Sequence, residues 1–269
     1  MKTLLKTALV TGASAGIGRE LARILVRERG MTVVATARRL DRLNQLRDEL
    51  PRGMLIPIAG DLGDPRFRED LWTRALGATE GLDVLINNAG IGLRGAFVDQ
   101  NMGEIERLLQ LNLVALIDMT QKAIIHMSDR KSGQIVQISS IVGAFGVPYS
   151  AVYSASKHAV DGLVKSLRPE LRGTGVKIWA ARPGRTASEF YKLALGGEVP
   201  SEKIPSARSA VTVARAIARG LDHRQTFLAP TIDAALLISL TRWLPGFEYV
   251  MGRVAKRMFD QELSELKRS

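Results

Sequence analysis

The stretch LLKTALVTGASAGIG, residues 4–18, decides the fold of this chain. Its first half, residues 4–11, is a short apolar run rich in strand formers, and residues 19–29 carry apolar side chains at helical spacing. Between them, Gly12, Gly16 and Gly18 permit a tight turn whose backbone N–H groups can approach a pyrophosphate at the helix N-terminus. A glycine turn that only caps a helix is the alternative. The strand and helix on either side favour a dinucleotide-binding loop.

A second strand, residues 31–37, completes a βαβ unit and carries information about the nucleotide. An acidic residue near the end of this strand would bind the adenosine ribose hydroxyls of NAD. This chain has Ala37 there, followed by Arg38 and Arg39. Guanidinium groups can hold a 2′-phosphate through charge-assisted hydrogen bonds, which favours NADP over NAD. The alternative is that both arginines merely open the helix predicted at residues 41–50.

Strands and helices go on alternating along the chain, with short loops between them. This pattern predicts an α/β fold in which helices cover both faces of a parallel sheet, and ligands then bind at the carboxyl ends of the strands. The further predicted strands are residues 54–59, 82–86, 134–138, 176–181 and 225–229, and the long predicted helices are residues 103–127 and 155–171. The residues expected at strand ends are Gly12, Arg38, Asp61, Asn88, Ser140 and Pro183.

The segment Tyr153-Ser154-Ala155-Ser156-Lys157 is the main candidate for chemistry. On a helix, Tyr153 and Lys157 share one face, and an ammonium near a phenol favours the phenolate and lowers its pKa. Tyr153 could then donate or accept a proton near neutral pH. The alternative is a half-buried surface pair that met by chance. Asn112 is a second candidate: inside an apolar helix it must find partners, either as a structural tie or at a kink that holds a water.

Composition limits the remaining classes of function. With 269 residues, 46% of them hydrophobic, the chain can bury one large core. It has no cysteine and only three widely spaced histidines, so no metal site is expected. The net charge of +11 is scattered over helices without a recognisable binding motif, so nucleic acid is not expected as a partner. The N-terminus leaves no room for a signal peptide before the first strand, which indicates the cytoplasm.

The motifs occur in one order: Thr11-Gly12-xxx-Gly16-Ile17-Gly18, Asp61, Asn87-Asn88-Ala89-Gly90, Asn112, Ser140, Tyr153-xxx-Lys157 and Pro183-Gly184. As a set, the chain resembles the short-chain dehydrogenase/reductase family from about Lys6 to about Phe190. The resemblance implies a Rossmann-type, doubly wound fold with seven parallel strands, a nicotinamide cofactor and a Ser-Tyr-Lys site supported by an asparagine. It also implies subunit pairing through the long helices, as a homodimer or homotetramer.

The resemblance implies a role for each catalytic residue. Tyr153 is the general acid or base on a carbonyl or alcohol oxygen, while Lys157 lowers the pKa of Tyr153 and hydrogen-bonds the nicotinamide ribose. Ser140 orients and polarises the substrate oxygen, with Ser139 as its less favoured neighbour. Asn112 holds a water that relays protons toward Lys157.

The resemblance also implies a set of cofactor contacts. In addition to Tyr153 and Lys157, these are Gly12, Ser14, Gly16, Ile17 and Gly18 at the pyrophosphate, Arg38 and Arg39 at the 2′-phosphate, Asp61 and Leu62 at the adenine, Asn88, Ala89 and Gly90 along the cofactor, and Pro183, Gly184, Thr186 and Ser188 beside the nicotinamide. Two residues depart from the family pattern. Ala15 stands where many NADP-using relatives carry a basic residue, so the phosphate contact depends on the two arginines. Arg185 replaces a neutral residue, and it either points to solvent or meets an acidic group.

Residues 1–190 are expected to form the dinucleotide-binding and catalytic core, and residues 191–269 a substrate lid and C-terminal segment of the same domain. The loop at residues 191–209 has the composition of a lid. The apolar run at residues 231–244 is too short to span a bilayer, which needs about 20 apolar residues. It packs over the substrate pocket or an interface, or residues 231–259 contact a membrane surface peripherally. Each version favours an apolar substrate.

The leading hypothesis is an NADP-dependent enzyme that interconverts a carbonyl and a secondary alcohol. One alternative is a catalytically silent dinucleotide-binding sensor or scaffold, although a mere binder has no need of Asn112, Ser140, Tyr153 and Lys157 together. The other is a membrane-peripheral lipid-ketone reductase.

Overall fold

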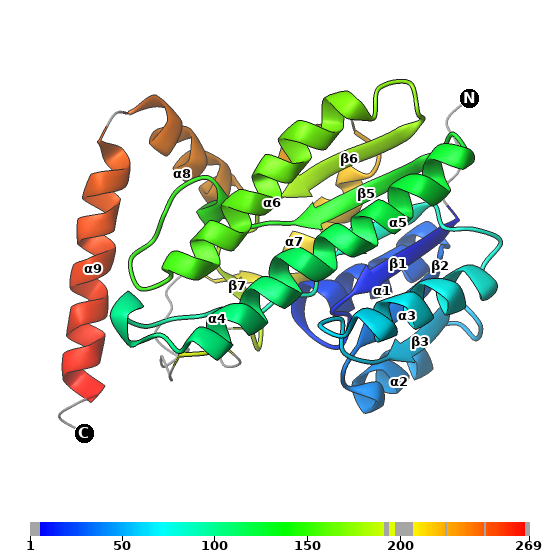
Figure 1. Ribbon diagram of the computed structural model, residues 1–269, viewed down its shortest axis with the longest axis horizontal. Coiled ribbons are helices and arrows are strands. Elements are labelled where there is room, and N and C mark those ends of the chain that lie inside the picture. The colour runs from blue at the N-terminus through cyan, green and yellow to red at the C-terminus, as the bar shows by residue number, and fades with distance from the viewer. Residues whose placement is uncertain (1–5, 191–193, 197–206, 224, 245, 267–269) are drawn as a thin grey trace.

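The computed structural model describes residues 6–190, 194–196, 207–223, 225–244 and 246–266. Seven strands form one sheet in the order β3-β2-β1-β4-β5-β6-β9, and every neighbouring pair is parallel (Figure 1). The predicted Rossmann-type, doubly wound fold in a single domain is confirmed. The strands are β1 (Thr7–Thr11), β2 (Thr32–Ala37), β3 (Leu55–Ala59), β4 (Val84–Asn87), β5 (Gly133–Ile138), β6 (Val176–Ala181) and β9 (Phe227–Leu228), with a separate short pair, β7 (Thr186–Ala187) and β8 (Arg208–Ser209).

Helices cover both faces of the sheet and bury two apolar layers. One layer contains side chains of α1, α2 and α7, and the other contains side chains of α3, α5 and α6. Ala8, Leu9 and Val10 in the centre of β1 are fully buried, as expected for a strand with a helix on either side. The helices are α1 (Gly16–Arg29), α2 (Leu40–Asp48), α3 (Pro65–Gly77), α4 (Met102–Leu109), α5 (Leu116–Asp129), α6 (Ala151–Glu170), α7 (Ala210–Gly220), α8 (Ile232–Trp243) and α9 (Phe247–Leu266).

Two of the long helices differ from their predicted extent. The helix predicted at residues 103–127 consists of α4, a π-helical segment at Gln110–Ala115, and α5. Helix α6 begins at Ala151, four residues earlier than predicted, so Tyr153 and Lys157 both lie inside it. By length and hydropathy alone, the continuous described run Met102–Asp129 could cross a membrane. In this fold it covers the sheet, as apolar core helices do.

The C-terminal helices lie at one end of the sheet. Figure 1 shows α8 leading away from the body and α9 turning back beside it. The apolar run at residues 231–244 forms α8, and α9 follows it toward the C-terminus. Of the predicted lid, residues 191–193 and 197–206 lie outside the described residues.

Candidate active site

A cavity of about 870 Å³ opens at the carboxyl edge of the sheet. Its wall includes the loops that follow β1 to β6, so it lies where a doubly wound sheet binds its ligands. Ser140, Tyr153 and Lys157 all contribute to this wall. The predicted cofactor residues on the wall are Gly12, Ser14, Gly16, Ile17, Arg38, Arg39, Asp61, Leu62, Asn88, Ala89, Gly90, Pro183, Gly184, Thr186 and Ser188.

Gly18, unlike the other predicted cofactor residues, lies behind the wall. A Cβ at this position would overlap the side-chain amide of Asn88. That amide nitrogen donates to the carbonyl oxygens of Thr11 (2.9 Å) and Gly12 (3.2 Å), which ties the end of β4 to the end of β1. Gly18 therefore supports the glycine loop through close packing.

Arg38 and Arg39 line the end of the cavity beside the loop after β2, where the sequence predicts the adenosine of the cofactor. Arg38 is exposed and forms no ion pair with any residue that the structure describes. Arg39 is half-buried, and its Nη2 donates to Ser14 Oγ at 3.3 Å. Its Nη1 lies 2.9 Å from Oε2 of Glu189. Two guanidinium groups thus flank the part of the cleft where the sequence predicts a 2′-phosphate.

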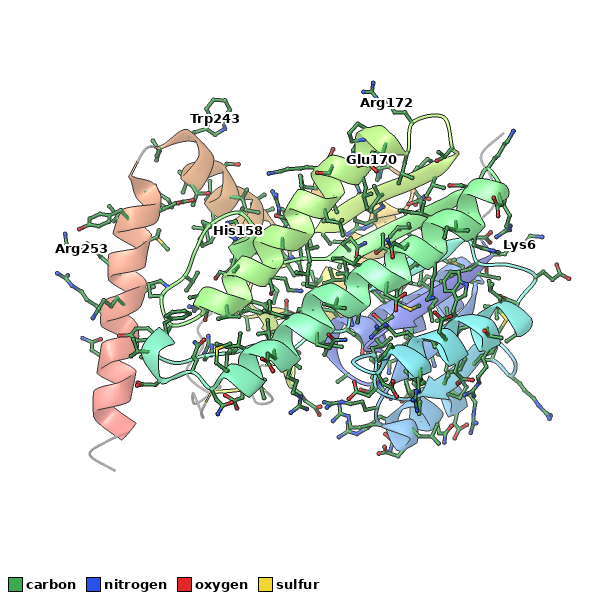
Figure 2. All side chains as sticks on the ribbon, in the orientation of Figure 1. Lys6, His158, Glu170, Arg172, Trp243 and Arg253 are labelled. Carbon is green, nitrogen blue, oxygen red and sulfur yellow. The ribbon has the colours of Figure 1, made fainter. Side chains whose placement is uncertain are left out.

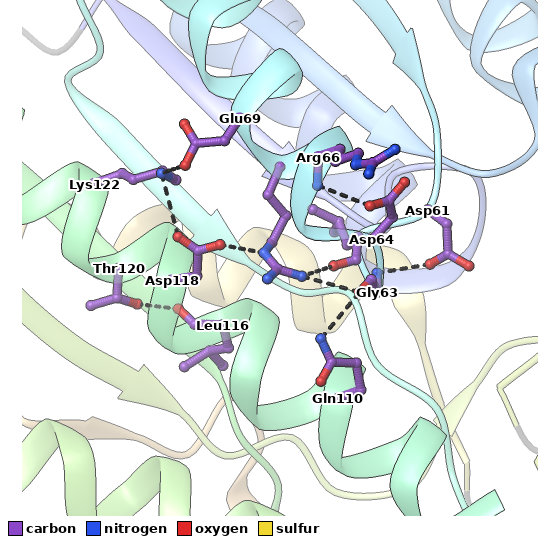
Figure 3. A network of polar contacts seen from close by, with 12 residues as sticks. Asp61, Gly63, Asp64, Arg66, Glu69, Gln110, Leu116, Asp118, Thr120 and Lys122 are labelled. Atoms are coloured by element: carbon purple, nitrogen blue, oxygen red, sulfur yellow. Dashed lines mark hydrogen bonds and ion pairs between the residues drawn. The ribbon is translucent and has the colours of Figure 1, made fainter. Parts of the chain in front are cut away.

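The loop after β3, which carries the predicted adenine contacts, is held by a polar network (Figure 3). Arg68 on α3 is buried, and its Nη1 donates to the carbonyl oxygens of Leu62 (2.7 Å) and Gly63 (3.2 Å). Its Nε donates to Asp118 on α5, and Gln110 Nε2 donates to Gly63 O at 3.1 Å. A buried guanidinium needs such partners for its donors, so this network fixes the loop against two helices before any ligand binds.

Lys157 is a buried cation on the opposite side of the cavity. Its Nζ donates to the carbonyl oxygen of Ile138 at 2.9 Å and lies 5.7 Å from the centre of the Tyr153 ring. Burial lowers the pKa of Lys157 to about 8, and the nearby negative charge of Asp161 opposes that shift. The side chain is thus a cation at neutral pH that loses its proton within the working range of many enzymes.

Tyr153 lies one helical turn before Lys157, and its half-buried ring packs against Phe190 with centroids 5.6 Å apart. Of the two serines after β5, Ser140 is the more accessible, and its Oγ accepts the N–H of Val142 at 3.3 Å. Ser139 is buried, and its Oγ donates to Lys157 O at 3.4 Å. The geometry therefore favours Ser140 over Ser139 as the serine that meets a ligand.

Asn112 lies behind the wall of the cavity, in the π-helical segment. Its side chain accepts the N–H of Ile91 (2.8 Å) and donates to the Ile91 carbonyl (2.9 Å), so it pairs with the backbone after β4. The expected structural tie is confirmed. The water relay toward Lys157 stays a prediction.

Gly90 lies in the cavity wall where a side chain would meet Asn112 and Lys157. A Cβ at Gly90 would lie 3.1 Å from Asn112 Oδ1 and 3.8 Å from Lys157 Nζ, so any larger residue would crowd these two side chains. The glycine turn and the arginine pair line the other end of the same cavity. Small residues, a buried cation and guanidinium groups along one cleft suit a nicotinamide dinucleotide.

Sequence comparison identifies the family. The model of the short chain dehydrogenase family matches residues 6–194. The chain belongs to the short-chain dehydrogenase/reductase family. Its members are oxidoreductases that act on CH–OH groups with a nicotinamide nucleotide, so the predicted enzyme class is confirmed at this level.

Three known proteins illustrate the similarity. A ketoacyl reductase, HetN, of Nostoc sp. is 34% identical over 82% of this chain and 77% of its own length. A farnesol dehydrogenase of Aedes aegypti is 37% identical over 69% of this chain and 79% of its own length. A short-chain dehydrogenase from Sphingobium yanoikuyae, solved in complex with NADPH, is 31% identical, has a TM-score of 0.79, and aligns over 88% of this chain and 93% of its own. Two further curated relatives are longer, and the chain spans 58% and 61% of their lengths.

Sequence reasoning missed a buried ion pair next to Lys157. Asp161, one turn after Lys157, is 2% exposed, and its Oδ2 accepts from Arg182 Nε (2.8 Å) at the end of β6. The Arg182 guanidinium in turn stacks on the Phe227 ring at 3.6 Å. The helical spacing of Lys157 and Asp161 places them on one face of a helix, but no sequence signal indicated the contact with Arg182.

The sequence also did not predict which residues line the apolar end of the cavity. Beyond Tyr153, the wall passes from polar residues to side chains of the loop after β5 and of helices α8 and α9. This part of the wall includes Phe145, Val147, Leu236, Leu240, Met251 and Val254. Arg185 is exposed and also lines the cavity, so its two expected roles, facing solvent or meeting an acidic group, both stay predictions.

Proposed function

We propose that the protein interconverts a carbonyl and a secondary alcohol by hydride transfer with NADP(H), and that Tyr153 is its general acid or base. The observation that carries the proposal is the shared cavity: Ser140, Tyr153 and Lys157 line the same wall as the glycine loop. A catalytically silent nucleotide sensor would need the loop but not this group of side chains.

Each side chain has a distinct task in the proposed reaction. The nicotinamide, when bound, supplies or accepts the hydride. As negative charge develops on the substrate oxygen during reduction, the hydroxyls of Ser140 and Tyr153 donate hydrogen bonds to it, and Tyr153 gives its proton. Lys157, as a cation, favours the phenolate that remains. Asn112 fixes the backbone beside this corner, and a water bound near it would return a proton toward Lys157.

NADP is the proposed nucleotide because two arginines follow β2 and no carboxylate does. Exposed Arg38 and half-buried Arg39 can both approach a 2′-phosphate, whereas the acidic residue that would bind the ribose hydroxyls of NAD is missing from the end of β2. The Sphingobium relative was solved with NADPH, which agrees with this choice.

The substrate is proposed to be apolar and bulky. The cavity end beyond Tyr153 is lined mainly by aliphatic and aromatic side chains, which would desolvate such a molecule favourably. Relatives named for farnesol and for ketoacyl groups are consistent with a long apolar chain. In this proposal residues 1–190 bind the cofactor and carry the catalysis, and residues 191–269 complete the substrate site.

A substrate panel tests the proposed reaction. We expect NADPH absorbance to fall fastest with long-chain or bulky apolar ketones, and more slowly with sugars or short polar ketones. NADH should support a clearly lower rate at the same concentration. No oxidation of either nucleotide with any carbonyl, and none in the reverse direction with the alcohols, would contradict the proposal.

A peripheral contact with a lipid surface is proposed for the C-terminal helices. Trp243 at the end of α8 is 74% exposed and Tyr249 on α9 is 70% exposed. Figure 2 shows Trp243 and Arg253 directed away from the body of the protein. Exposed aromatic side chains beside basic ones suit the interface of an anionic bilayer. A membrane here would bring an apolar substrate close to helices that also line the cavity.

Vesicle co-sedimentation tests this contact. We expect the protein to pellet with vesicles that contain anionic lipid, and less with neutral vesicles. The double substitution of Trp243 and Tyr249 by serine should reduce pelleting severalfold while NADPH binding stays unchanged. If the protein remains in the supernatant with both kinds of vesicle, the lipid contact is wrong and the reductase proposal is unaffected.

A homodimer or homotetramer is also proposed. The outer face of the helical run Met102–Asp129 exposes Val114 (44%) and Ile125 (66%), which a second copy could cover. Light scattering on the purified protein measures this directly.

A further inference from the structure

Glu189 places a carboxylate at the adenosine end of the cofactor cleft. It follows β7 and is 150 residues from Arg39 in the chain, yet its Oε2 lies 2.9 Å from Arg39 Nη1, and its Oε1 lies 3.6 Å from Arg42 Nη2. All three side chains are partly exposed, at 37% to 42%. Glu189 and Arg39 both line the cavity. An acidic side chain is therefore held where the proposed function needs a binding site for an anion.

The chain segment that carries Glu189 also lies against the glycine turn. A Cβ at Gly16 would come within 3.0 Å of Ser188 Cβ, so the residue before Glu189 is in contact range of the loop that would hold the pyrophosphate. The segment thus runs from the end of β6, past the glycine turn, to the arginines after β2. Its two points of approach are Gly16, in the loop proposed to bind the pyrophosphate, and Arg39, which is proposed to bind the 2′-phosphate.

The chemistry at Arg39 makes this carboxylate a competitor for phosphate. Arg39 donates Nη2 to Ser14 Oγ and pairs through Nη1 with Glu189, so a phosphate that bound Nη1 would have to displace the carboxylate. A 2′-phosphate carries up to two negative charges, and it would be repelled by a carboxylate that stays beside the same guanidinium. NAD has no phosphate there, so its binding leaves the ion pair between Glu189 and Arg39 undisturbed.

We propose that Glu189 is a specificity-determining residue that competes with the cofactor 2′-phosphate for Arg39 and so limits the preference for NADPH over NADH. The inference rests on the proposed function. NADPH binding requires Glu189 to release Arg39, while Arg38, exposed beside it, offers the phosphate a first contact. NADH binding has no such requirement.

Fluorescence titration of NADPH and NADH into the full-length protein tests this competition. Because partly exposed ion pairs are weak, we expect Glu189→Gln to tighten NADPH binding by about threefold to tenfold. The affinity for NADH should change by less than about twofold. Glu28→Gln is the matched control. Glu28 forms an exposed ion pair with Arg215, with 2.9 Å between Oε1 and Nη2, and neither residue lines the cavity. It should alter neither affinity.

A double-substitution cycle isolates the pair. In an Arg39→Gln background, Glu189→Gln should tighten NADPH binding by less than it does in the wild type, because the guanidinium over which they compete is gone and only the charge repulsion between carboxylate and phosphate remains. Rising salt should shrink the effect of Glu189→Gln in the wild-type background.

The outcomes separate this inference from the proposed function. If the wild-type protein binds NADPH and Glu189→Gln leaves that affinity unchanged or weakens it, the competition is wrong and the reductase proposal stands. Weaker binding of both nucleotides would show that Glu189 instead closes the cleft over any dinucleotide. If the wild-type protein binds neither nucleotide, the proposed function itself fails.

Discussion

Tyr153→Phe should lower turnover by roughly 10²–10³ while leaving NADPH binding within about twofold of the wild-type value. The substitution removes one hydroxyl, which in the proposed reaction both donates to the developing oxyanion and supplies the proton. The ring itself is kept, so its packing against Phe190 persists and the fold should be unaffected. Steady-state kinetics with the best ketone of the panel, together with fluorescence titration of NADPH, measures both quantities.

The control for this prediction is the same change at a distant tyrosine. Tyr249 is 70% exposed on α9, and Tyr249→Phe should retain wild-type turnover. Near-normal turnover of Tyr153→Phe would show that another group donates the proton. A parallel loss of turnover and melting temperature would indicate a folding defect instead.

Lys157→Met should produce a loss of similar size, about hundredfold or more, and also weaken NADPH binding. The wild-type pH profile carries the more specific signature. Because the pKa of Lys157 is lowered from 10.5 to about 8, its ammonium is present below pH 8 and is lost as the pH rises through that value. Carbonyl reduction should therefore decline on the alkaline side with a midpoint near pH 8, as the cation that supports the phenolate disappears.

Asp161→Asn provides a test of this assignment. The negative charge of Asp161 raises the pKa of Lys157 against the effect of burial, so its removal should move the alkaline limb to lower pH. An alkaline limb that stays in place in Asp161→Asn, or that persists in Lys157→Met, would assign the pH dependence to a different group. The position of the limb is independent of how much active protein each variant yields.

The fold and most of the cavity wall could be predicted because their signals are local. The glycine turn follows a strand and precedes a helix within a few residues, and the strand ends converge by topology once the sheet is parallel. Tyr153 and Lys157 are paired by helical spacing alone. The predicted role of the two arginines after β2 in binding a 2′-phosphate follows from the absence of an acidic residue at position 37.

What the sequence could not predict are long-range contacts and unusual backbone. Nothing in the spacing of the chain brings Glu189 to Arg39, or Arg182 to Asp161. Helix α6 starts earlier than predicted because Tyr149, with φ at 60°, makes the turn that precedes it, and a positive φ in a non-glycine residue has no strong sequence signal. Gly18 shows a further limit: a Cβ there would overlap the Asn88 amide and the Gly12 carbonyl, and the contact with Asn88 has no local sequence signal.

The π-helical segment at Gln110–Ala115 has a consequence for how this chain can change in length. Such a segment holds one surplus residue, so deleting one residue there would allow a regular α-helix to run from α4 into α5. Each residue turns an α-helix by about 100°, and a shortened helix would therefore swing Asn112 away from the Ile91 backbone. The helix would survive the deletion, and the hydrogen bonds between Asn112 and the Ile91 backbone would be lost. The pairing of Asn112 with Ile91 therefore depends on the number of residues in this segment as well as on their types.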